Sequence, residues 1–213
     1  MQKRAHGVTI TWLGHSCFVL ESGGFRVLLD PFRDVRGLAD AALEADAVYC
    51  SHGHFDHAYT DQIRLTSGKE NPFQVAEVPT FHDDQSGALR GGNTVRRFAA
   101  EGMRVVHAGD LGHQLSAGQL EAIGPCDVLL LPVGGTYTVD ARTAKAVADA
   151  LNPRVVVPMH YRKGSMGFDV LTTLEDFTSQ YPPELVRTYP GSTLTAAPGM
   201  ERQVAVLQAK LAL

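Results

Sequence analysis

The sequence predicts an α/β fold in which a sandwich of two mixed β-sheets is flanked by helices. Short apolar stretches typical of buried strands alternate with amphipathic helical stretches, and the N-terminal part has the pattern of an antiparallel hairpin. The chain of 213 residues is long enough for one sizeable core and contains no linker-like or low-complexity segment. We therefore expect a single domain over residues 1–213.

Residues 1–30 are predicted to form a β-hairpin or meander. Val8 to Trp12 and Cys17 to Leu20 are apolar and β-prone, and Ser22-Gly23-Gly24 provides a turn. Arg26 to Leu29 follows as a third strand. Because a hairpin is antiparallel, we expect the sheets to be mixed rather than purely parallel.

Residues 38–77 have a less regular pattern. Leu38 to Ala45 is rich in alanine and leucine and predicts a short helix, which leads into a strand over Ala47 to Cys50. Ala58 to Glu77 is polar with weak periodicity and allows no assignment. We expect the region from Ala58 to Gly92 to shape a substrate pocket.

The second half of the chain has a clear alternation of strands and helices. Its predicted helices begin at the polar capping residues Ser116 and Asp140 and stop at Gly-Pro or Asn-Pro pairs. In chain order the expected elements are a strand over Arg104–Val106, a helix over Ser116–Ile123, a strand over Val128–Leu131, a helix over Asp140–Leu151, a strand over Arg154–Val157, a helix near Leu171–Gln180 and a last strand near Val204–Leu207.

The composition is that of an ordinary globular protein. Charged residues make up 20% of the chain, the hydrophobic set makes up 44%, and the formal net charge is -4. These values give no electrostatic reason to expect a nucleic-acid or membrane partner. We expect a small-molecule substrate, and the sequence leaves open whether the chain forms a homo-oligomer.

The expected location is the cytoplasm. Trp12-Leu13-Gly14-His15 interrupts the first apolar stretch, unlike a signal peptide, and the sequence has no run of 18 apolar residues that would span a bilayer. Cys17, Cys50 and Cys126 are scattered and lie in or beside apolar runs. This pattern is typical of free thiols in a reducing compartment.

Polar residues directly follow several of the predicted apolar strands. Ser51-His52 follows Cys50, His107 and Asp110 follow Val106, and His160 follows the strand that ends near Val157. In layered α/β folds, ligands bind in crevices beyond strand ends. Residues far apart in the sequence are therefore expected to converge at one edge.

A cluster of three histidines and one aspartate indicates a metal site. His52, His54, Asp56 and His57 fall within six residues. Residues two apart in an extended segment point the same way, so His52 and His54 can hold one ion, while Gly53 permits a bend that turns Asp56 and His57 toward a second position. Imidazole and carboxylate ligands suit zinc, manganese or iron. A polar turn with surface histidines is disfavoured, because imidazoles this dense are costly to bury without a partner.

Six segments in order along the chain resemble the metallo-β-lactamase-fold hydrolases, most of all the short, single-domain, lactonase-like prokaryotic members. The resemblance covers Thr11 to Tyr161 and implies a four-layer αβ/βα sandwich of two mixed β-sheets flanked by helices. The segments are TWLGHSCF, LLDPF, SHGHFDH, HAGDLGH, PVGG with TVDA, and PMHY.

The resemblance also implies a dinuclear metal site. Asp110 would bridge the two metals, and Asp30 would orient the histidine-rich loop. The cofactors would be two divalent ions, with zinc expected first and manganese or iron as alternatives. The first metal would be bound by His52, His54 and His82, and the second by Asp56, His57 and His160.

A dinuclear site of this kind predicts hydrolysis. Two divalent ions about 3.5–4 Å apart share one water and lower its pKa, which gives a bridging hydroxide that attacks an electrophilic carbon or phosphorus. Asp110 would fix the metal separation, and Asp56 would position the hydroxide or shuttle a proton; these two are the predicted catalytic residues. We expect an ester-like bond to be cleaved, in a lactone, a phosphodiester or a related small molecule.

Three alternatives compete with this prediction. A redox di-iron member of the fold usually has Glu at the position of His54 and a flavin module, neither of which is found in this sequence. A non-catalytic metal-binding or interaction protein would keep the ligands without turnover. A nuclease of the RNA-processing branch would need a large insertion between Asp110 and His160, where this chain has 49 residues.

The resemblance gives no metal-binding role to the remaining histidines. His15 is expected to line the site without binding metal, and His113 either to reach substrate or to play a supporting part. His107 is expected to pack inside and His6 to be solvated. The sequence leaves open the roles of Arg90, Tyr161 and Lys163.

Overall fold

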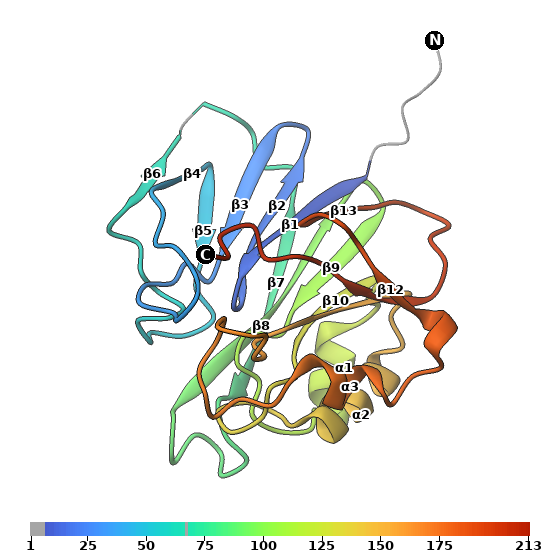
Figure 1. The fold of residues 1–213 in the computed structure, drawn as a ribbon. Helices are drawn as coiled ribbons and strands as arrows, with labels where there is room; N and C mark the ends of the chain where they lie inside the picture. Colours follow the sequence, from blue (N-terminus) through green and yellow to red (C-terminus); the bar gives the residue numbers. More distant parts are fainter. Residues whose placement is uncertain (1–6, 67) are drawn as a thin grey trace.

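The computed structural model describes residues 7–66 and 68–213 and has two main β-sheets (Figure 1). His6 lies outside these residues. The first sheet has five strands and is mixed, as predicted from the hairpin-like N-terminus. Its strands, in spatial order, are β13 (Thr193–Ala196), β1 (Val8–Gly14), β2 (Cys17–Ser22), β3 (Phe25–Leu29) and β5 (Ala47–Tyr49).

The second main sheet has seven strands and is also mixed. The two sheets confirm the predicted α/β sandwich. In spatial order the strands of this sheet are β12 (Val186–Thr188), β14 (Gln203–Val206), β11 (Val155–Met159), β10 (Val128–Pro132), β9 (Met103–His107), β8 (Gly92–Ala100) and β7 (Gln74–Phe81).

The helices α1 (Ala117–Ile123), α2 (Ala141–Leu151) and α3 (Leu174–Thr178) gather on one side of the molecule (Figure 1). The first contacts β7 and β8, and the second contacts β10 and α3. The predicted caps are confirmed, because the Ser116 and Asp140 side chains accept hydrogen bonds from the backbone N–H groups of Gln119 and Thr143. A short 3₁₀-helix, Pro183–Leu185, precedes β12. None of the helices in residues 7–66 and 68–213 is long and apolar enough to cross a bilayer.

The predicted N-terminal hairpin is confirmed. β2 pairs antiparallel with β1 and with β3, and Phe18 lies opposite Leu29. Gly23 and Gly24 have φ values of 57° and 78°, which glycine adopts without the strain that a Cβ brings. The β-prone segments and the turn chemistry agree, so local sequence alone specifies this part of the sheet.

The predicted helix over Leu38 to Ala45 is wrong. Leu43–Ala45 forms the strand β4, which pairs in parallel with β6 (Ile63–Leu65), and Leu38 forms an isolated bridge with Ala212. A helix of two turns is marginal without tertiary packing, so the pairing with distant segments prevails over the alanine-rich composition. The partner β6 lies in the stretch that the sequence left unassigned.

Other differences concern short elements and edge strands. The helix predicted near Leu171 to Gln180 is reduced to α3, which has five residues. The strands β7 and β8 form a long antiparallel hairpin that the sequence did not predict, and neither did it predict β12 or β13. These strands carry polar residues on exposed faces, so their hydrophobic pattern is weak.

The two main sheets pack face to face around an aromatic core. Phe18 on β2 lies edge-on to His107 on β9, with ring centroids 6.0 Å apart, and Tyr49 on β5 lies 5.3 Å from Phe98 on β8. Cys17 points to the opposite side of its strand from Phe18. All three cysteines are free thiols; Cys17 and Cys126 are buried and Cys50 is half-buried.

The strand directions bring the polar strand ends together. In the five-stranded sheet, β1, β3 and β5 run the same way because β2 is antiparallel to both of its neighbours. In the seven-stranded sheet, β7, β9, β10 and β11 also run the same way, with β8 antiparallel between β7 and β9. The carboxyl ends of each set therefore lie along one edge of each sheet.

Candidate metal centre

The predicted ligands, and the neighbouring site residues His15 and Asp30, all follow the carboxyl ends of strands. Each is the first polar residue, or nearly so, after a strand that places it at the shared edge. His15 follows β1, Asp30 follows β3, His52 to His57 follow β5, His82 follows β7, Asp110 follows β9 and His160 follows β11.

The backbone turns sharply at three of these positions. His15, Asp30 and His160 have φ values of 52°, 44° and 54°. Non-glycine residues are uncommon in this left-handed region, and a conformation of about 1–3 kcal/mol higher energy persists only where the surroundings impose it. The turn directs each side chain away from its strand and into the edge between the sheets.

The first cluster consists of His52, His54 and His82. Its donor atoms lie within 4.8 Å of one another. His52 Nε2 lies 3.0 Å from His54 Nδ1, and the rings of His52 and His82 are 4.6 Å apart at their centroids. The His54 side chain is exposed, His52 is half-buried and His82 is buried. Three imidazoles from two loops thus face one point that remains open to solvent.

The second cluster consists of His15, Asp56, His57 and His160, again with donor atoms within 4.8 Å of one another. His57 and His160 are fully buried, and their rings lie 5.7 Å apart. The two clusters adjoin, because the rings of His52 and His57 lie 4.4 Å apart at their centroids. His15 lies beside Asp56, His57 and His160, the set that the resemblance implied for the second metal.

Asp110 lies between the two clusters. Its Oδ2 atom is 3.4 Å from Nε2 of His82, in the first cluster. The same oxygen is 3.2 Å and 3.1 Å from Nε2 of His57 and His160, in the second cluster. Only 2% of the Asp110 residue is exposed. This carboxylate therefore faces imidazole nitrogens of both clusters.

Asp30 orients two histidines through its carboxylate. Its Oδ2 atom accepts a hydrogen bond from Nδ1 of His57 at 2.8 Å and another from the Ser51 hydroxyl at 2.6 Å. The Ser51 hydroxyl lies 2.9 Å from Nδ1 of His52 and accepts from it in the tautomer that this arrangement favours. In their neutral forms both histidines then have an unprotonated Nε2 atom, which lies 3.0 Å from His54 Nδ1 for His52 and 3.2 Å from Asp110 Oδ2 for His57.

Two residues near Asp110 fix its backbone. The Asn93 side-chain oxygen accepts the Asp110 N–H at 2.9 Å, and its amide group donates to Ala108 and Thr80. Gly109 has φ 56°, and a Cβ at this position would lie 2.3 Å from the Asn93 oxygen and 2.4 Å from Ser51 Cβ. Glycine is therefore required where three site segments meet.

The electrostatics of the buried part favour a positive charge. Burial alone would lower the pKa of His57, but the nearby carboxylates of Asp110 and Asp30 raise it well above its usual value. Burial alone would raise the pKa of Asp110, but the charges of His160 and His57 hold it well below its usual range. These carboxylates stabilise a cation next to His57, which either a proton or a metal ion can supply.

His15 is neutral and contacts Asp56. Burial, together with the charge of His160, lowers the pKa of His15 to about 4. Its Nε2 atom lies 3.3 Å from Oδ2 of Asp56, and because Asp56 stays ionised, His15 donates this hydrogen bond. The main chain also links the same segments, since the His160 N–H donates to the His15 carbonyl at 3.3 Å.

The other singled-out residues lie apart from the centre. His107 is buried as predicted, with Nε2 2.9 Å from the Ser16 carbonyl. His113 accepts the Phe81 N–H, so it supports a loop. Tyr161 is buried against Trp12, and the Lys163 ammonium bonds the Gln208 side chain 3.0 Å away. Neither Tyr161 nor Lys163 lines the pocket described next.

A pocket of about 560 Å³ opens above the clusters, and we call it the centre pocket. Its floor contains ligands from both clusters, and its sides contain aromatic residues and one arginine. It is lined by Gly53, His54, Phe55, Asp56, His82, Arg90, Asp110, Tyr137 and Phe168.

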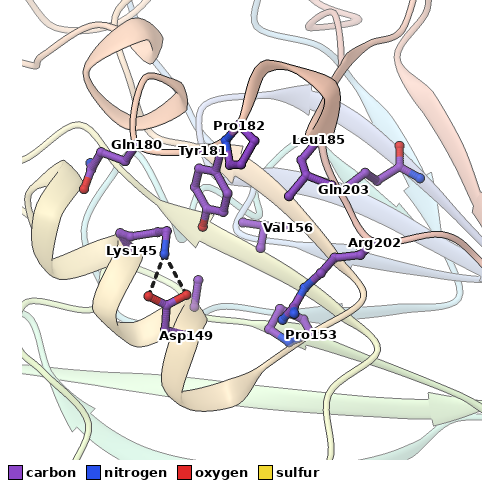
Figure 2. Close-up of a pocket in the computed structure, with 11 residues that line it drawn as sticks. Lys145, Asp149, Pro153, Val156, Gln180, Tyr181, Pro182, Leu185, Arg202 and Gln203 are labelled. Carbon is purple, nitrogen blue, oxygen red and sulfur yellow. Dashed lines mark hydrogen bonds and ion pairs between the residues drawn. The ribbon is translucent and has the colours of Figure 1, made fainter.

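A second hollow of about 220 Å³, the α2 cleft, lies between α2 and the segment after α3 (Figure 2). Figure 2 shows the Lys145 ammonium joined to the Asp149 carboxylate, and the two lie 2.6 Å apart. The Lys145 ammonium also lies 5.0 Å from the centre of the Tyr181 ring. The α2 cleft is lined by Lys145, Ala148, Asp149, Pro153, Val156, Gln180, Tyr181, Pro182, Leu185, Arg202 and Gln203.

Sequence reasoning missed the residues that hold the ligands in place. Ser51 was noted only as the residue before His52, and Asn93 was given no role. Both are polar residues buried at strand ends, with 4% and 3% exposure. A buried polar residue next to a ligand is the signal that would have found them, but burial is not visible in one sequence.

The fold and the clusters define a class, the metallo-β-lactamase-like proteins, and comparison with known proteins agrees. A family model described as the beta-lactamase superfamily domain matches residues 9–160. A UPF0173 metal-dependent hydrolase from Methanoregula boonei is 32% identical over 184 residues, covering 71% of this chain and 81% of that protein. The chain therefore belongs to the beta-lactamase superfamily.

Two solved structures are similar over most of their length. A Thermotoga maritima protein, assigned to the zinc-dependent hydrolases of the metallo-β-lactamase superfamily, is 36% identical with a TM-score of 0.74. The alignment covers 94% of this chain and 98% of that one. Igni18, a metallo hydrolase from Ignicoccus hospitalis, is 26% identical with a TM-score of 0.61, covering 88% and 97% of the two chains.

Proposed function

We propose that this protein is a metal-dependent hydrolase that holds two divalent cations and cleaves an ester-like bond. The observation that carries the proposal is the position of Asp110 Oδ2, within 3.4 Å of imidazole nitrogens from both clusters. One carboxylate that faces two ligand sets is the arrangement that a pair of ions needs. The names of the relatives, metal-dependent hydrolases and metallo hydrolases, support the same class of reaction.

The spacing of the donor atoms fits metal coordination. Two ligand atoms bound at about 2.0–2.1 Å to one tetrahedral zinc ion lie about 3.3 Å apart. The contact between His52 and His54 is 3.0 Å, and the three contacts to Asp110 are 3.1 to 3.4 Å. The distances between these donor atoms are therefore those expected for ligands that share metal ions.

The buried imidazole nitrogens also lack partners of their own. Within the described part of the chain, Nε2 of His57 and both nitrogens of His160 form no hydrogen bond, although Nε2 of each faces Asp110. A buried polar atom without a partner costs about 1–3 kcal/mol. A metal ion that accepts the Nε2 lone pairs of His57 and His160 removes that cost for these two atoms, so the donor set fits the group.

Each residue of the centre has a distinct task. The histidines bind, Asp30 and Ser51 hold two of them in one tautomer, and Asp110 sets the separation of the two positions. Burial opposes ionisation of Asp56, but its hydrogen bond from His15 and the charge of His57 lower its pKa. Asp56 thus remains a carboxylate that can accept a hydrogen bond or a proton in the pocket.

When bound, two divalent cations supply Lewis acidity and activate water at neutral pH. Imidazole and carboxylate donors with no thiolate suit zinc first, and manganese or iron next. The centre pocket has the size range of small-molecule sites, about 300–1,000 Å³. A lactone, a phosphodiester or a related small ester is therefore the substrate class that we propose.

The test measures metal content and hydrolysis together. Protein purified without added metal should contain two metal ions per chain after reconstitution and should hydrolyse at least one substrate in a panel of lactones, phosphodiesters and thioesters. His54→Ala and Asp110→Ala should lose metal and turnover while keeping the circular dichroism spectrum of the parent. His113→Ala, which removes a histidine outside the centre, should keep both.

Two results contradict the proposal. Full activity in His54→Ala or Asp110→Ala excludes the assigned centre. Two bound metals without turnover of any substrate in the panel favours a non-catalytic metal-binding protein over a hydrolase.

A further inference from the structure

The centre pocket has an aromatic side and a charged rim in addition to its metal-binding floor. Phe168 lies edge-on to Tyr137, with ring centroids 6.2 Å apart, and edge-on to His15 at 5.6 Å. These contacts join the second cluster to the rim through a continuous row of rings. Phe55, with 51% exposure, lines the same pocket from the histidine-rich loop. Flat apolar surface therefore faces the space above the floor.

Arg90 is the only lysine or arginine among the described residues that line this pocket. Its guanidinium lies 5.6 Å from the centre of the Tyr137 ring, which is within the range of cation–π contact. Arg90 and Tyr137 are the two described residues that line both the centre pocket and a neighbouring polar hollow. That hollow also contains Asp84 and Asp140. The charge thus lies where the two hollows adjoin.

The Arg90 guanidinium has no carboxylate partner in the part of the chain that the structure describes. Ion pairs within 4.0 Å are formed by other arginines, such as Arg96 with Glu77 and Arg104 with Asp127, but not by Arg90. Neither Asp84 nor Asp140 reaches it at that distance. A half-buried guanidinium without a carboxylate partner can bind a ligand anion through its N–H groups.

The loop that carries Arg90 is held rigidly by one buried carboxylate. Asp83, with 3% exposure, directly follows the ligand His82. Its Oδ1 atom accepts the N–H groups of Gln85 and Gly87 at 2.9 and 2.8 Å, and its Oδ2 atom accepts those of Leu89 and Arg90 at 2.9 and 2.8 Å. The main chain at Arg90 is therefore held in place before a ligand binds, which lowers the entropy cost of ordering this loop.

The charge of the loaded floor has the same sign as Arg90. The positive charge of two divalent cations is larger than the combined negative charge of Asp56 and Asp110, which are the carboxylates among the described lining residues. The pocket of a loaded enzyme is thus positive at the floor and at the rim, with rings between. A ligand that matches it has an apolar, planar body and an anionic group.

We propose that the substrate is a small organic anion with a planar apolar part, and that Arg90 is the residue that selects it. The anionic group, a carboxylate or a phosphate, binds Arg90, the planar part stacks along Tyr137 and Phe168, and the scissile bond lies over the floor. Only the placement of the scissile bond over the floor rests on the proposed hydrolase function. The binding of the anion to Arg90 does not depend on it.

The first experiment measures binding to metal-depleted protein by isothermal titration calorimetry. The probes are 2-naphthoate, 2-naphthylphosphonate and the neutral 2-naphthamide. We expect at least one anion to bind about tenfold more tightly than the amide, and Arg90→Gln to remove that preference. Arg90→Lys should restore part of it. Arg187→Gln, which removes an exposed arginine on β12, should bind as the parent does.

The relative affinity of the two anions identifies the group, and either order supports the proposal. Equal binding of the amide and both anions overturns it, and so does unchanged anion binding in Arg90→Gln. Equal loss of amide and anion binding in Arg90→Gln also overturns it, because the residue would then act only on the shape of the pocket.

The second experiment compares two esters with the same leaving group on the zinc-loaded enzyme. Mono-4-nitrophenyl succinate carries a remote carboxylate, and 4-nitrophenyl butyrate does not. Arg90→Gln should lower kcat/KM for the succinate about tenfold and change the butyrate less than about twofold. An equal change for both contradicts the selective role. If neither ester nor any other substrate is hydrolysed, the hydrolase function fails, while the calorimetric result still decides the role of Arg90.

Discussion

The centre pocket and the α2 cleft are both hollows lined by titratable groups, and they differ in what those groups already contact. In the α2 cleft the charged groups have partners: Lys145 is paired with Asp149 at 2.6 Å, and the Arg202 guanidinium donates to the Asn152 side chain. The neutral Tyr181 hydroxyl is the described lining group there that forms no hydrogen bond. In the centre, Nε2 of His57 and of His160 face Asp110 without forming a hydrogen bond.

This difference separates a structural arrangement of charges from a binding site. Charged groups that satisfy one another leave little to offer a ligand, whereas buried donors that converge without bonding need a further partner. The shape of a hollow does not make this distinction. The following predictions test whether buried polar groups that face one another without a hydrogen bond mark the functional site.

The largest expected effect is that of Asp110→Asn. The substitution keeps the size of the side chain but removes the charge shared by the two clusters. We expect at least about a thousandfold loss of kcat/KM and a lower metal content, because charge stabilisation by a bridging group acts in the transition state. Steady-state kinetics and metal analysis check this. Asp149→Asn in the α2 cleft is the matched control, and an equal loss in both variants would remove the distinction between the hollows.

A smaller effect is expected for Asp30→Asn. This substitution keeps the fold but changes the hydrogen bonds that orient His57 and, through Ser51, His52. Groups that orient metal ligands are worth about 10–100-fold in metal affinity, so competition with a chelator should show weaker zinc binding by that factor. Unchanged affinity in Asp30→Asn would contradict the orienting role.

The pH dependence of stability should reveal a paired carboxylate that lies in neither hollow. Although partial burial opposes it, the hydrogen bonds from Arg104 lower the pKa of Asp127. A lowered folded-state pKa contributes stability that is complete above the unfolded-state pKa of about 3.9 and is lost as the pH falls through the folded-state value.

Asp127→Asn should therefore lower the free energy of unfolding at pH 7 by about 1 kcal/mol and flatten its decrease under acid conditions. Urea denaturation at pH 7 and between pH 5 and pH 3 measures both effects. Metal content at pH 7 should stay at the parental value. A parallel acid decrease in the variant and the parent would contradict the assignment to Asp127.

The smallest effect is expected in the α2 cleft. Lys145→Ala breaks an ion pair between residues four apart on a helix, which is worth about 0.3–0.5 kcal/mol. Thermal denaturation should show a small decrease in stability, and kcat/KM should change less than about twofold. A loss of turnover comparable to that of Asp110→Asn would make the cleft part of the functional site.

The fold was predictable where local pattern and tertiary structure agree. The hairpin from Val8 to Leu29, the capped α2 and the buried β10 and β11 each carry a strong pattern and a turn or cap signal. The segment from Leu38 to Ala45 was not predictable, because its conformation depends on pairing with Ile63–Leu65 and Ala212. Such contacts between distant residues leave little trace in a single sequence.

The centre was predictable as far as its ligand types and strand ends allow. His52, His54, Asp56 and His57 are adjacent in sequence, and Asp110 and His160 follow clear strands. The inclusion of His15 in the second cluster depends on the irregular pairing after Trp12 and on the positive φ of His15. The row from Tyr137 to Phe168 depends on two loops that the hydrophobic pattern does not describe.

The most direct test of the central claim is anomalous X-ray diffraction from crystals of the zinc-loaded protein. The account predicts two zinc peaks per chain, one contacted by His52, His54 and His82 and the other by Asp56, His57 and His160. Asp110 should contact both. A single peak, a peak confined to the α2 cleft, or two peaks that Asp110 does not join would contradict it.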